Sequence, residues 1–145
     1  MVHPQVLQKY SLFGGLTEDQ IKSILPNMLN ETYSPDEFII TEGKPNDKIY
    51  FLIEGQVAVI KGDIVLSKFS EGEAFGEMEV LDVMPAAASV KALTPVTLMS
   101  VSNQALRKIY RIDIAAFSLI IMNLARDLSR RLRKMDDKMV LPVLV

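Results

Sequence analysis

The sequence contains no cysteine and no tryptophan, and its only histidine is His3. Without cysteine the chain forms no disulfide, no thiolate zinc site and no cysteine-held iron–sulfur cluster. No window reaches the roughly 18 to 20 uninterrupted apolar residues that a membrane-spanning helix needs. The first residues also lack the basic patch and apolar run of a secretory signal. These absences predict a cytoplasmic protein that does not associate with membranes.

Groups for acid–base or nucleophilic chemistry are scarce as well. His3 lies at the extreme N-terminus, where we expect disorder, and one histidine without a second ligand is a weak case for haem. No nucleophile stands beside a base in a recognisable context. Glu71, Glu73, Glu77 and Glu79 lie close together, but their spacing across a turn favours a solvated acidic rim over a metal site. The sequence therefore predicts neither a catalytic residue nor a metal site.

Length and charge limit the remaining possibilities. The 145 residues suffice for one domain with a proper core but not for two. The net charge of −2 is unevenly spread, because residues 1–106 hold 7 Lys/Arg and 14 Asp/Glu whereas residues 107–145 hold 9 and 4. A basic C-terminal segment fits nucleic acid or an acidic partner. The favoured interpretation is a solvated helix face.

Residues 1–30 and 103–139 are predicted to be helical. Thr17 and Gln20 have the spacing of a capping box, which places a helix start at Glu18, while Gly14-Gly15 interrupts the first segment. Ser102 or Asn103 caps a short helix that continues to Tyr110. A long helix without proline or glycine is then predicted for residues 113–138, and an apolar tail follows Met139.

Between these segments, residues 31–102 are predicted to form a β-roll. Short apolar runs alternate here with turn residues, as in Ile49–Ile53 followed by Glu-Gly and Val57–Ile60 followed by Lys-Gly-Asp. Strands at this spacing, with glycine in the turns, are typical of a sandwich or barrel. The fold class is therefore mainly β with flanking helices.

The most informative stretch of the roll lies within residues 72–90 and includes Phe75-Gly-Glu-Met78 and Pro85-Ala-Ala-Ala-Ser-Val90. It resembles the phosphate-binding cassette of cyclic-nucleotide-binding domains, in which Phe-Gly-Glu-Leu is followed after about seven residues by Pro-Arg-Ala-Ala-Thr-Val. The resemblance extends over nearly the whole chain. It implies one domain over residues 1–145, in which an N-terminal helical bundle precedes a jelly roll and a long C-terminal helix. The implied ligand-binding residues are Phe75, Gly76, Glu77, Met78, Pro85, Ala86 and Ala87.

The cassette departs from the family pattern at Ala86, where the family has the arginine that clamps the cyclic phosphate. Glu77 matches the acceptor of the ribose hydroxyl, and the amide of Ala87 remains able to donate. Truncating one side of a buried charged pair typically costs ~2–5 kcal/mol, so the resemblance implies weakened or altered binding of cAMP, cGMP or another small molecule. Lys44 or Lys91 is a candidate substitute, although strand alternation places Lys91 on the opposite face.

A purely structural interpretation of the same residues stays open. Gly76 and Glu77 also suit an ordinary turn, with an acid favoured in the first turn of a short helix. The three residues 86–88 also suit a tightly packed strand crossing as small core residues. A degenerate roll of this kind would bind no nucleotide and act as a dimerisation or protein-docking module.

The long helix carries an apolar stripe that either packs on its own roll or forms a parallel dimer interface. Seven turns exceed what a small roll can cover, and arginines border the stripe, so a homodimer is favoured. Only a few residues follow Lys138, which leaves no room for the helix-turn-helix of related transcription factors. The resemblance therefore implies a non-enzymatic sensor, or a subunit that regulates a protein partner in trans. The predicted interface residues are Phe117, Ile121, Leu124, Leu128, Leu132 and Met135.

Overall fold

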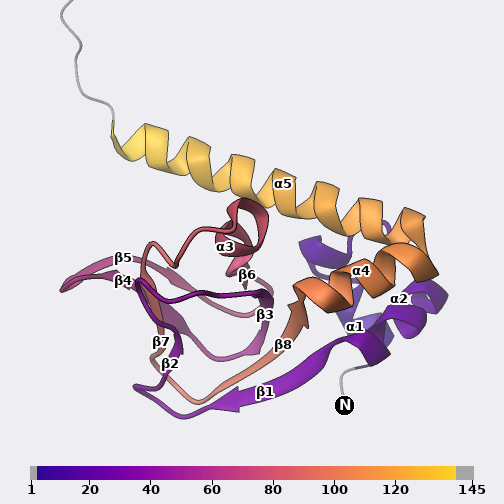
Figure 1. The fold of residues 1–145 in the computed structure, drawn as a ribbon, viewed down its shortest axis with the longest axis horizontal. Helices are drawn as coiled ribbons and strands as arrows, with labels where there is room; N and C mark the ends of the chain where they lie inside the picture. Colours follow the sequence, from indigo (N-terminus) through magenta and orange to yellow (C-terminus); the bar gives the residue numbers. More distant parts are fainter. Residues whose placement is uncertain (1–2, 140–145) are drawn as a thin grey trace, which may run out of the picture.

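A computed structural model describes residues 3–139, and the apolar tail predicted beyond Met139 lies outside this range. A β-roll occupies one side and the N-terminal helices with α4 occupy the other, while the long helix α5 crosses above both (Figure 1). The predicted order of helices, roll and long helix is confirmed.

The N-terminal segment consists of short helical pieces joined by turns. The predicted capping box is present, since the Thr17 hydroxyl accepts from the Gln20 amide at 3.1 Å and the Gln20 side chain accepts from the Thr17 amide at 3.0 Å. The expected disorder of His3 is wrong, because its side chain caps α1 by accepting from the Gln5 amide. The pieces are α1 (Pro4–Leu7), the 3-10 helix η1 (Ser11–Phe13), α2 (Glu18–Ile24) and the 3-10 helix η2 (Leu25–Asn27).

Two four-stranded antiparallel sheets form the roll. Their strand orders are β1-β8-β3-β6 and β2-β7-β4-β5. The strands are β1 (Leu29–Tyr33), β2 (Phe38–Ile40), β3 (Lys48–Glu54), β4 (Val57–Lys61), β5 (Ile64–Phe69), β6 (Ala74–Phe75), β7 (Ser89–Ala92) and β8 (Val96–Ser102).

Strand β1 begins at Leu29, two residues inside the segment predicted to be helical. Its sequence, Leu-Asn-Glu-Thr-Tyr, has too little apolar alternation to predict a strand. Pairing with β8, from Leu29 opposite Ser100 to Tyr33 opposite Val96, holds it in the sheet. The predicted helical boundary at residue 30 is therefore wrong by two residues, because long-range pairing overrides local preference.

Strand β3 is buried on both faces, which explains its continuous apolar run. Ile49 and Phe51 contact the core between the sheet and the helices. Tyr50 and Leu52 belong to a second core inside the roll. The alternation of side chains along β3 therefore joins the two cores through a single strand.

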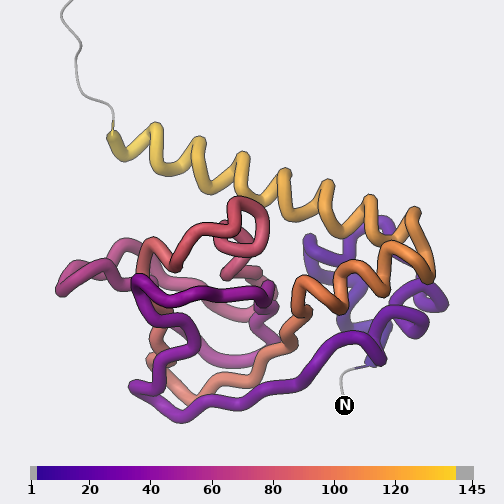
Figure 2. Tube along the Cα trace, viewed as in Figure 1, coloured from indigo at the N-terminus to yellow at the C-terminus, as the bar shows by residue number. Residues whose placement is uncertain are grey.

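Helices α4 (Asn103–Ile112) and α5 (Ile114–Lys138) follow β8 with little intervening chain. Each has an N-cap side chain: Ser102 accepts from the Ala105 amide at 3.0 Å, and Asp113 accepts from the Ala116 amide at 3.0 Å. The trace in Figure 2 shows α4 beside the indigo N-terminal helices, with α5 continuing over the roll. Within residues 3–139, none of the helices combines the length and apolar character that crossing a bilayer requires.

Candidate functional site

Gly76 sets the geometry of the cassette. It follows β6 directly and caps helix α3 (Glu77–Asp82) with a φ of 86°. A Cβ at this position would lie 2.7 Å from the carbonyl oxygen of Lys48, which is too close for any side chain to be accommodated without movement. Both the positive φ and the close approach of β3 therefore require glycine. As a result Glu77 is the first residue of α3.

The carboxylate of Glu77 is buried, with 3% of the residue exposed. Its Oε1 accepts from Nη1 of Arg131 at 3.1 Å. Its Oε2 is buried and has no hydrogen-bond partner within residues 3–139. Burial raises the pKa of Glu77 above its usual value, and the positive charge of Arg131 opposes that rise. A buried oxygen with an unused lone pair is prepared to accept from a hydroxyl.

Arg131 connects α5 to the cassette. Its guanidinium donates to Glu77 and to the carbonyl oxygen of Ala74, and its central carbon lies 4.4 Å from the centre of the Phe69 ring. An ion pair, a hydrogen bond and a cation–π contact therefore hold one side chain. From the sequence alone, Arg131 is only one of the arginines that border the apolar stripe, together with Arg126, Arg130 and Arg133. Because Arg131 and Glu77 are 54 positions apart in the sequence, no spacing signal links the two.

Ala86, which the sequence resemblance matches to the family arginine, is buried at 3% exposure. Its methyl group belongs to the core inside the roll, together with Phe75 and Val90. Its amide donates to the carbonyl oxygen of Lys44 at 2.9 Å, and its own carbonyl oxygen accepts from the Gly43 amide at 2.8 Å. The loop before β3 therefore uses both backbone groups of Ala86.

Ala87 is exposed and lies beside a lysine that the sequence did not single out. Lys61 donates from its Nζ to the carbonyl oxygen of Ala87 at 2.7 Å and lies 3.9 Å from a carboxylate oxygen of Glu42. In the β4–β7 pairing Val59 faces Val90, and both contact the roll core. Because alternate residues share a face, Lys61 lies on the same face as Val59.

The two lysines considered from sequence occupy different places. Lys91 forms an ion pair with Asp36, with 3.6 Å between Nζ and Oδ1. It pairs with Ala58 in the register of β4, on the opposite strand face from Val90, as alternation predicts. Lys44 contacts Ala86 through its backbone, and its side chain is exposed.

The remaining predicted ligand-binding residues divide between the core and the surface. Phe75 is buried and stacks on Tyr50 with 5.2 Å between ring centroids. Met78 is 53% exposed on α3, and Pro85 is exposed in the loop that follows. The structure therefore brings Phe75 and Ala86 together in one core, with Gly76 and Glu77 directly following Phe75.

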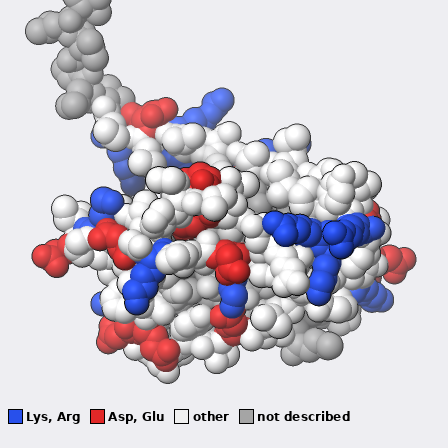
Figure 3. Space-filling model, viewed as in Figure 1, with Lys and Arg blue, Asp and Glu red and all other residues white. Residues whose placement is uncertain are grey.

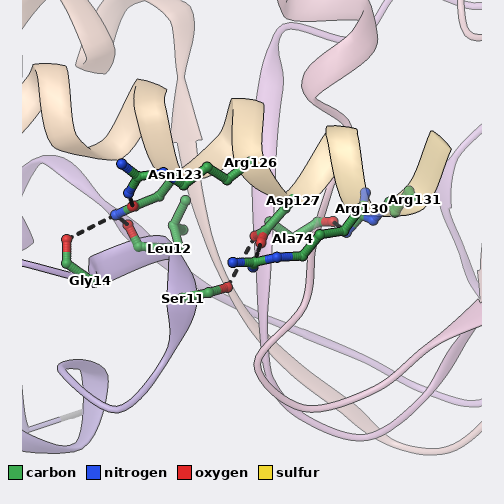
Figure 4. A network of polar contacts seen from close by, with 9 residues as sticks. All are labelled: Ser11, Leu12, Gly14, Ala74, Asn123, Arg126, Asp127, Arg130 and Arg131. Carbon is green, nitrogen blue, oxygen red and sulfur yellow. Dashed lines mark hydrogen bonds and ion pairs between the residues drawn. The ribbon is translucent and has the colours of Figure 1, made fainter. Parts of the chain in front are cut away.

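The first half of α5 is fixed to the N-terminal helices (Figure 4). The buried amide of Asn123 donates to the carbonyl oxygens of Leu12 and Gly14, each at 3.0 Å. Nearby, Ser11 donates to Asp127 at 3.0 Å. These contacts position the helix so that Arg131, two turns beyond Asn123, reaches the cassette.

The predicted interface stripe changes its environment along α5. Leu124 is buried, and Phe117, Ile121 and Leu128 are partly buried. Leu132 and Met135 are 60% and 56% exposed. The stripe therefore packs on its own domain at its start and is exposed at its end.

Comparisons with known proteins agree with this geometry. The family model described as "Cyclic nucleotide-binding domain" matches residues 30–113, which is more than half of the chain and includes the whole cassette. The chain belongs to the cyclic nucleotide-binding domain family.

Individual relatives share the domain but are much longer proteins. Human cGMP-dependent protein kinase 2 is 29% identical over 92% of this chain and 18% of its own length. The cAMP-dependent protein kinase regulatory subunit of Yarrowia lipolytica is 34% identical over 68% of this chain and 26% of its own. The chain therefore spans about a fifth to a quarter of these two curated relatives.

Solved structures give the same fold. A cyclic nucleotide-binding domain from Methylobacillus flagellatus has a TM-score of 0.86 at 25% identity, over 99% of this chain and 85% of that one. The Catabolite Activator Protein of Thermus thermophilus has a TM-score of 0.77 at 27% identity, over 89% of this chain and 61% of that one. The predicted β-roll with flanking helices is confirmed.

Proposed function

We propose that this domain is a non-enzymatic sensor that binds a cyclic nucleotide, cAMP or cGMP, between Glu77 and Ala87. The observation that carries the proposal is the buried Glu77 carboxylate, which has one oxygen bound to Arg131 and the other without a partner. A ribose hydroxyl donating to the second oxygen would satisfy it without breaking the ion pair. The names of relatives that depend on cAMP or cGMP support this choice of ligand.

In this proposal the phosphate meets Lys61 in place of an arginine. The Nζ of Lys61 lies 2.7 Å from the carbonyl oxygen of Ala87, the residue that follows Ala86. The Lys61 side chain is 61% exposed, so its charge is screened and its contribution is small. A lysine also lacks the planar pair of donors that an arginine presents to a phosphate. We therefore expect weaker binding than an arginine in the cassette would give.

Signal transmission would follow from the contacts of Arg131. This side chain joins the cassette to the half of α5 that is otherwise exposed. A ligand that strengthens or weakens the Glu77–Arg131 pair would shift the position of α5 by population shift. The proposed recipient of this change is a second copy of the chain or a regulated protein partner.

The test is calorimetry of the full chain with cAMP and cGMP, comparing Lys61→Gln with Lys68→Gln. Lys68 is also an exposed lysine of the β4–β5 hairpin, so both variants remove one positive charge. We expect a measurable affinity that falls about two- to fivefold in Lys61→Gln at low salt, and an unchanged affinity in Lys68→Gln. Absence of heat for both nucleotides at millimolar concentration contradicts the proposal.

The alternative is that the roll is degenerate, binds no nucleotide and acts as a dimerisation or protein-docking module. Both backbone groups of Ala86 are occupied by the loop at residues 43–44, and the two cavities beside α3 are lined by neither Glu77, Ala86 nor Ala87. These two observations favour a docking module. Failure of both nucleotides to bind, together with a stable dimer, would support it.

The dimer itself is proposed to form through the exposed end of the α5 stripe. Leu132 and Met135 lie on this stripe, and Met122 is an equally exposed apolar residue of α5 outside it. Sedimentation should show a dimer for the natural chain and for Met122→Glu, and a monomer for Leu132→Glu/Met135→Glu. An unchanged state in the double variant contradicts the interface.

A further inference from the structure

A cleft beside the cassette lies between α3, α4 and α5, and the cassette helix α3 forms one of its walls. Its volume is about 400 Å³, within the range of sites that bind small organic molecules. Each of the three helices supplies two apolar or aromatic residues to its lining: Val80, Leu81, Leu106, Tyr110, Phe117 and Ile121. Three helices thus present apolar side chains to one concave space.

Two arginines give this cleft a charged edge. Arg107 and Arg111 are spaced four residues apart on α4, so they lie on the same face of that helix, and both line the cleft. Neither forms an ion pair in the described part of the chain. Figure 3 shows basic side chains gathered over α4 on this face of the molecule. The cleft therefore combines an apolar interior with two positive charges that lack a protein counterion.

We propose that this cleft binds a small amphipathic carboxylate, with its hydrocarbon or aromatic body among the three helices and its carboxylate on Arg107 and Arg111. A guanidinium binds a carboxylate through two parallel hydrogen bonds. The two arginines are one turn apart on one wall, so they can converge on a single anionic group. Burial of the apolar body between α3 and α5 would provide the remaining affinity.

The shape of the site favours a free small molecule over a membrane or a protein partner. A bilayer presents a flat surface, which cannot fill a concave space between helices. Arg107 and Arg111 both lie at this one space, whereas a peptide ligand would be matched by charges distributed along an extended groove. Glu77, Lys61 and Ala87 do not line the cleft, so the proposed carboxylate site uses different side chains from the proposed nucleotide site.

Decanoate and 1-decanol form a suitable pair of probes, because they share the chain and differ in the charged group. The full chain, labelled with ¹⁵N, would be titrated with each below the micelle concentration and followed by amide chemical shifts. We expect saturable shifts at α3, α4 and the start of α5 with decanoate, and binding at least about tenfold weaker with decanol. Arg107 and Arg111 are both exposed, so Arg107→Gln and Arg111→Gln should each weaken decanoate binding by about two- to fivefold.

Lys108→Gln is the matched control. Lys108 lies between the two arginines on α4 and is exposed, but it does not line the cleft. It should change decanoate affinity less than about twofold. If decanoate affinity falls equally in all three variants, the effect is a general charge attraction, and the proposed site is wrong.

Three other results would also overturn the proposal. Absence of saturable shifts with decanoate would show that the cleft does not take this class of ligand. Shifts centred on Gly76 and Ala87 would assign the anion to the cassette instead. Binding of vesicles containing anionic phospholipid, without binding of free decanoate, would make the basic face a membrane surface.

Discussion

The two arms of the cassette differ in what they retain for an anionic sugar phosphate. The Gly76–Glu77 arm keeps a glycine that its backbone requires and a buried carboxylate with one free oxygen. The Ala86–Ala87 arm has a methyl group in the core, and the backbone of Ala86 is bonded to a neighbouring loop. In the proposed binding mode, the Gly76–Glu77 arm therefore has a group for the sugar, whereas the Ala86–Ala87 arm has no arginine for the phosphate.

Because the two arms differ, membership of the family does not by itself predict the affinity of this chain for a cyclic nucleotide. A cyclic nucleotide needs both a hydroxyl acceptor and a partner for its negative charge. Glu77 is the proposed acceptor for the hydroxyl, and the exposed Lys61 is the proposed partner for the negative charge. Restoring or removing charges on each side of the site tests the two arms separately.

The largest expected effect comes from restoring the missing guanidinium with Ala86→Arg. A buried charged pair is typically worth ~2–5 kcal/mol, which corresponds to a rise in cAMP or cGMP affinity of at least about 30-fold. Calorimetry of the variant measures this directly. Ala125→Arg, at an exposed alanine of α5, adds the same charge away from the cassette and should leave the affinity unchanged.

An unchanged affinity in a folded Ala86→Arg protein would show that the phosphate side is closed as well as uncharged. Thermal unfolding of both variants is the necessary companion measurement, because residue 86 is buried and a larger side chain there affects packing.

The next largest effect is expected at the Gly76–Glu77 arm of the cassette. Arg131→Ala should lower the free energy of unfolding by about 2 kcal/mol, because it leaves the buried Glu77 carboxylate without a counterion. This figure is below the value for a fully buried pair, since 26% of the Arg131 side chain is exposed. Urea denaturation measures the change.

The neighbouring Arg130→Ala provides the control for that substitution. Arg130 is 65% exposed and pairs with Asp127 three residues earlier in the same helix. Its removal should change the free energy of unfolding by no more than about 0.5 kcal/mol. Similar losses of unfolding free energy in the two variants would mean that the Glu77–Arg131 ion pair stabilises the fold no more than an exposed ion pair does.

The sequence predicted the fold further than it predicted the site. Local signals suffice for the capping box at Thr17 and for the cassette turn at Gly76, because the responsible residues are only a few positions apart. Strand β1 was not predicted, since its stability comes from pairing with β8 about 70 positions away. Arg131 contacts the cassette through the packing of α5, and Lys61 contacts it through the pairing of β4 with β7. Neither contact leaves a periodic or spacing signal in the chain.

A smaller effect is expected from pH. Burial raises the pKa of Glu77 in the folded protein, so folding favours the protonated form of this carboxyl. Its contribution to stability therefore increases as pH falls from neutral through the raised pKa, and levels off below the ordinary glutamate value of about 4.3.

Comparing Glu77→Gln with the natural chain isolates this group from all other carboxylates. The natural chain should gain stability relative to Glu77→Gln as the pH is lowered from 7 to 4, measured by urea denaturation at each pH. A difference that is constant over this range, or that changes in the opposite direction, contradicts a raised pKa.

The smallest expected effect lies at the end of α3, between the two arms. Val83 caps this helix with a φ of 57°, a conformation that costs a β-branched residue roughly 1–2 kcal/mol. Its side chain is 83% exposed, so little packing offsets the strain. Val83→Gly should therefore raise the free energy of unfolding by about 0.5 kcal/mol, because relief of strain exceeds the entropy that glycine adds to the unfolded chain. Val83→Ala, which keeps a Cβ and hence most of the strain, is the matched control. If both variants unfold at the same temperature, the turn between the arms is not strained.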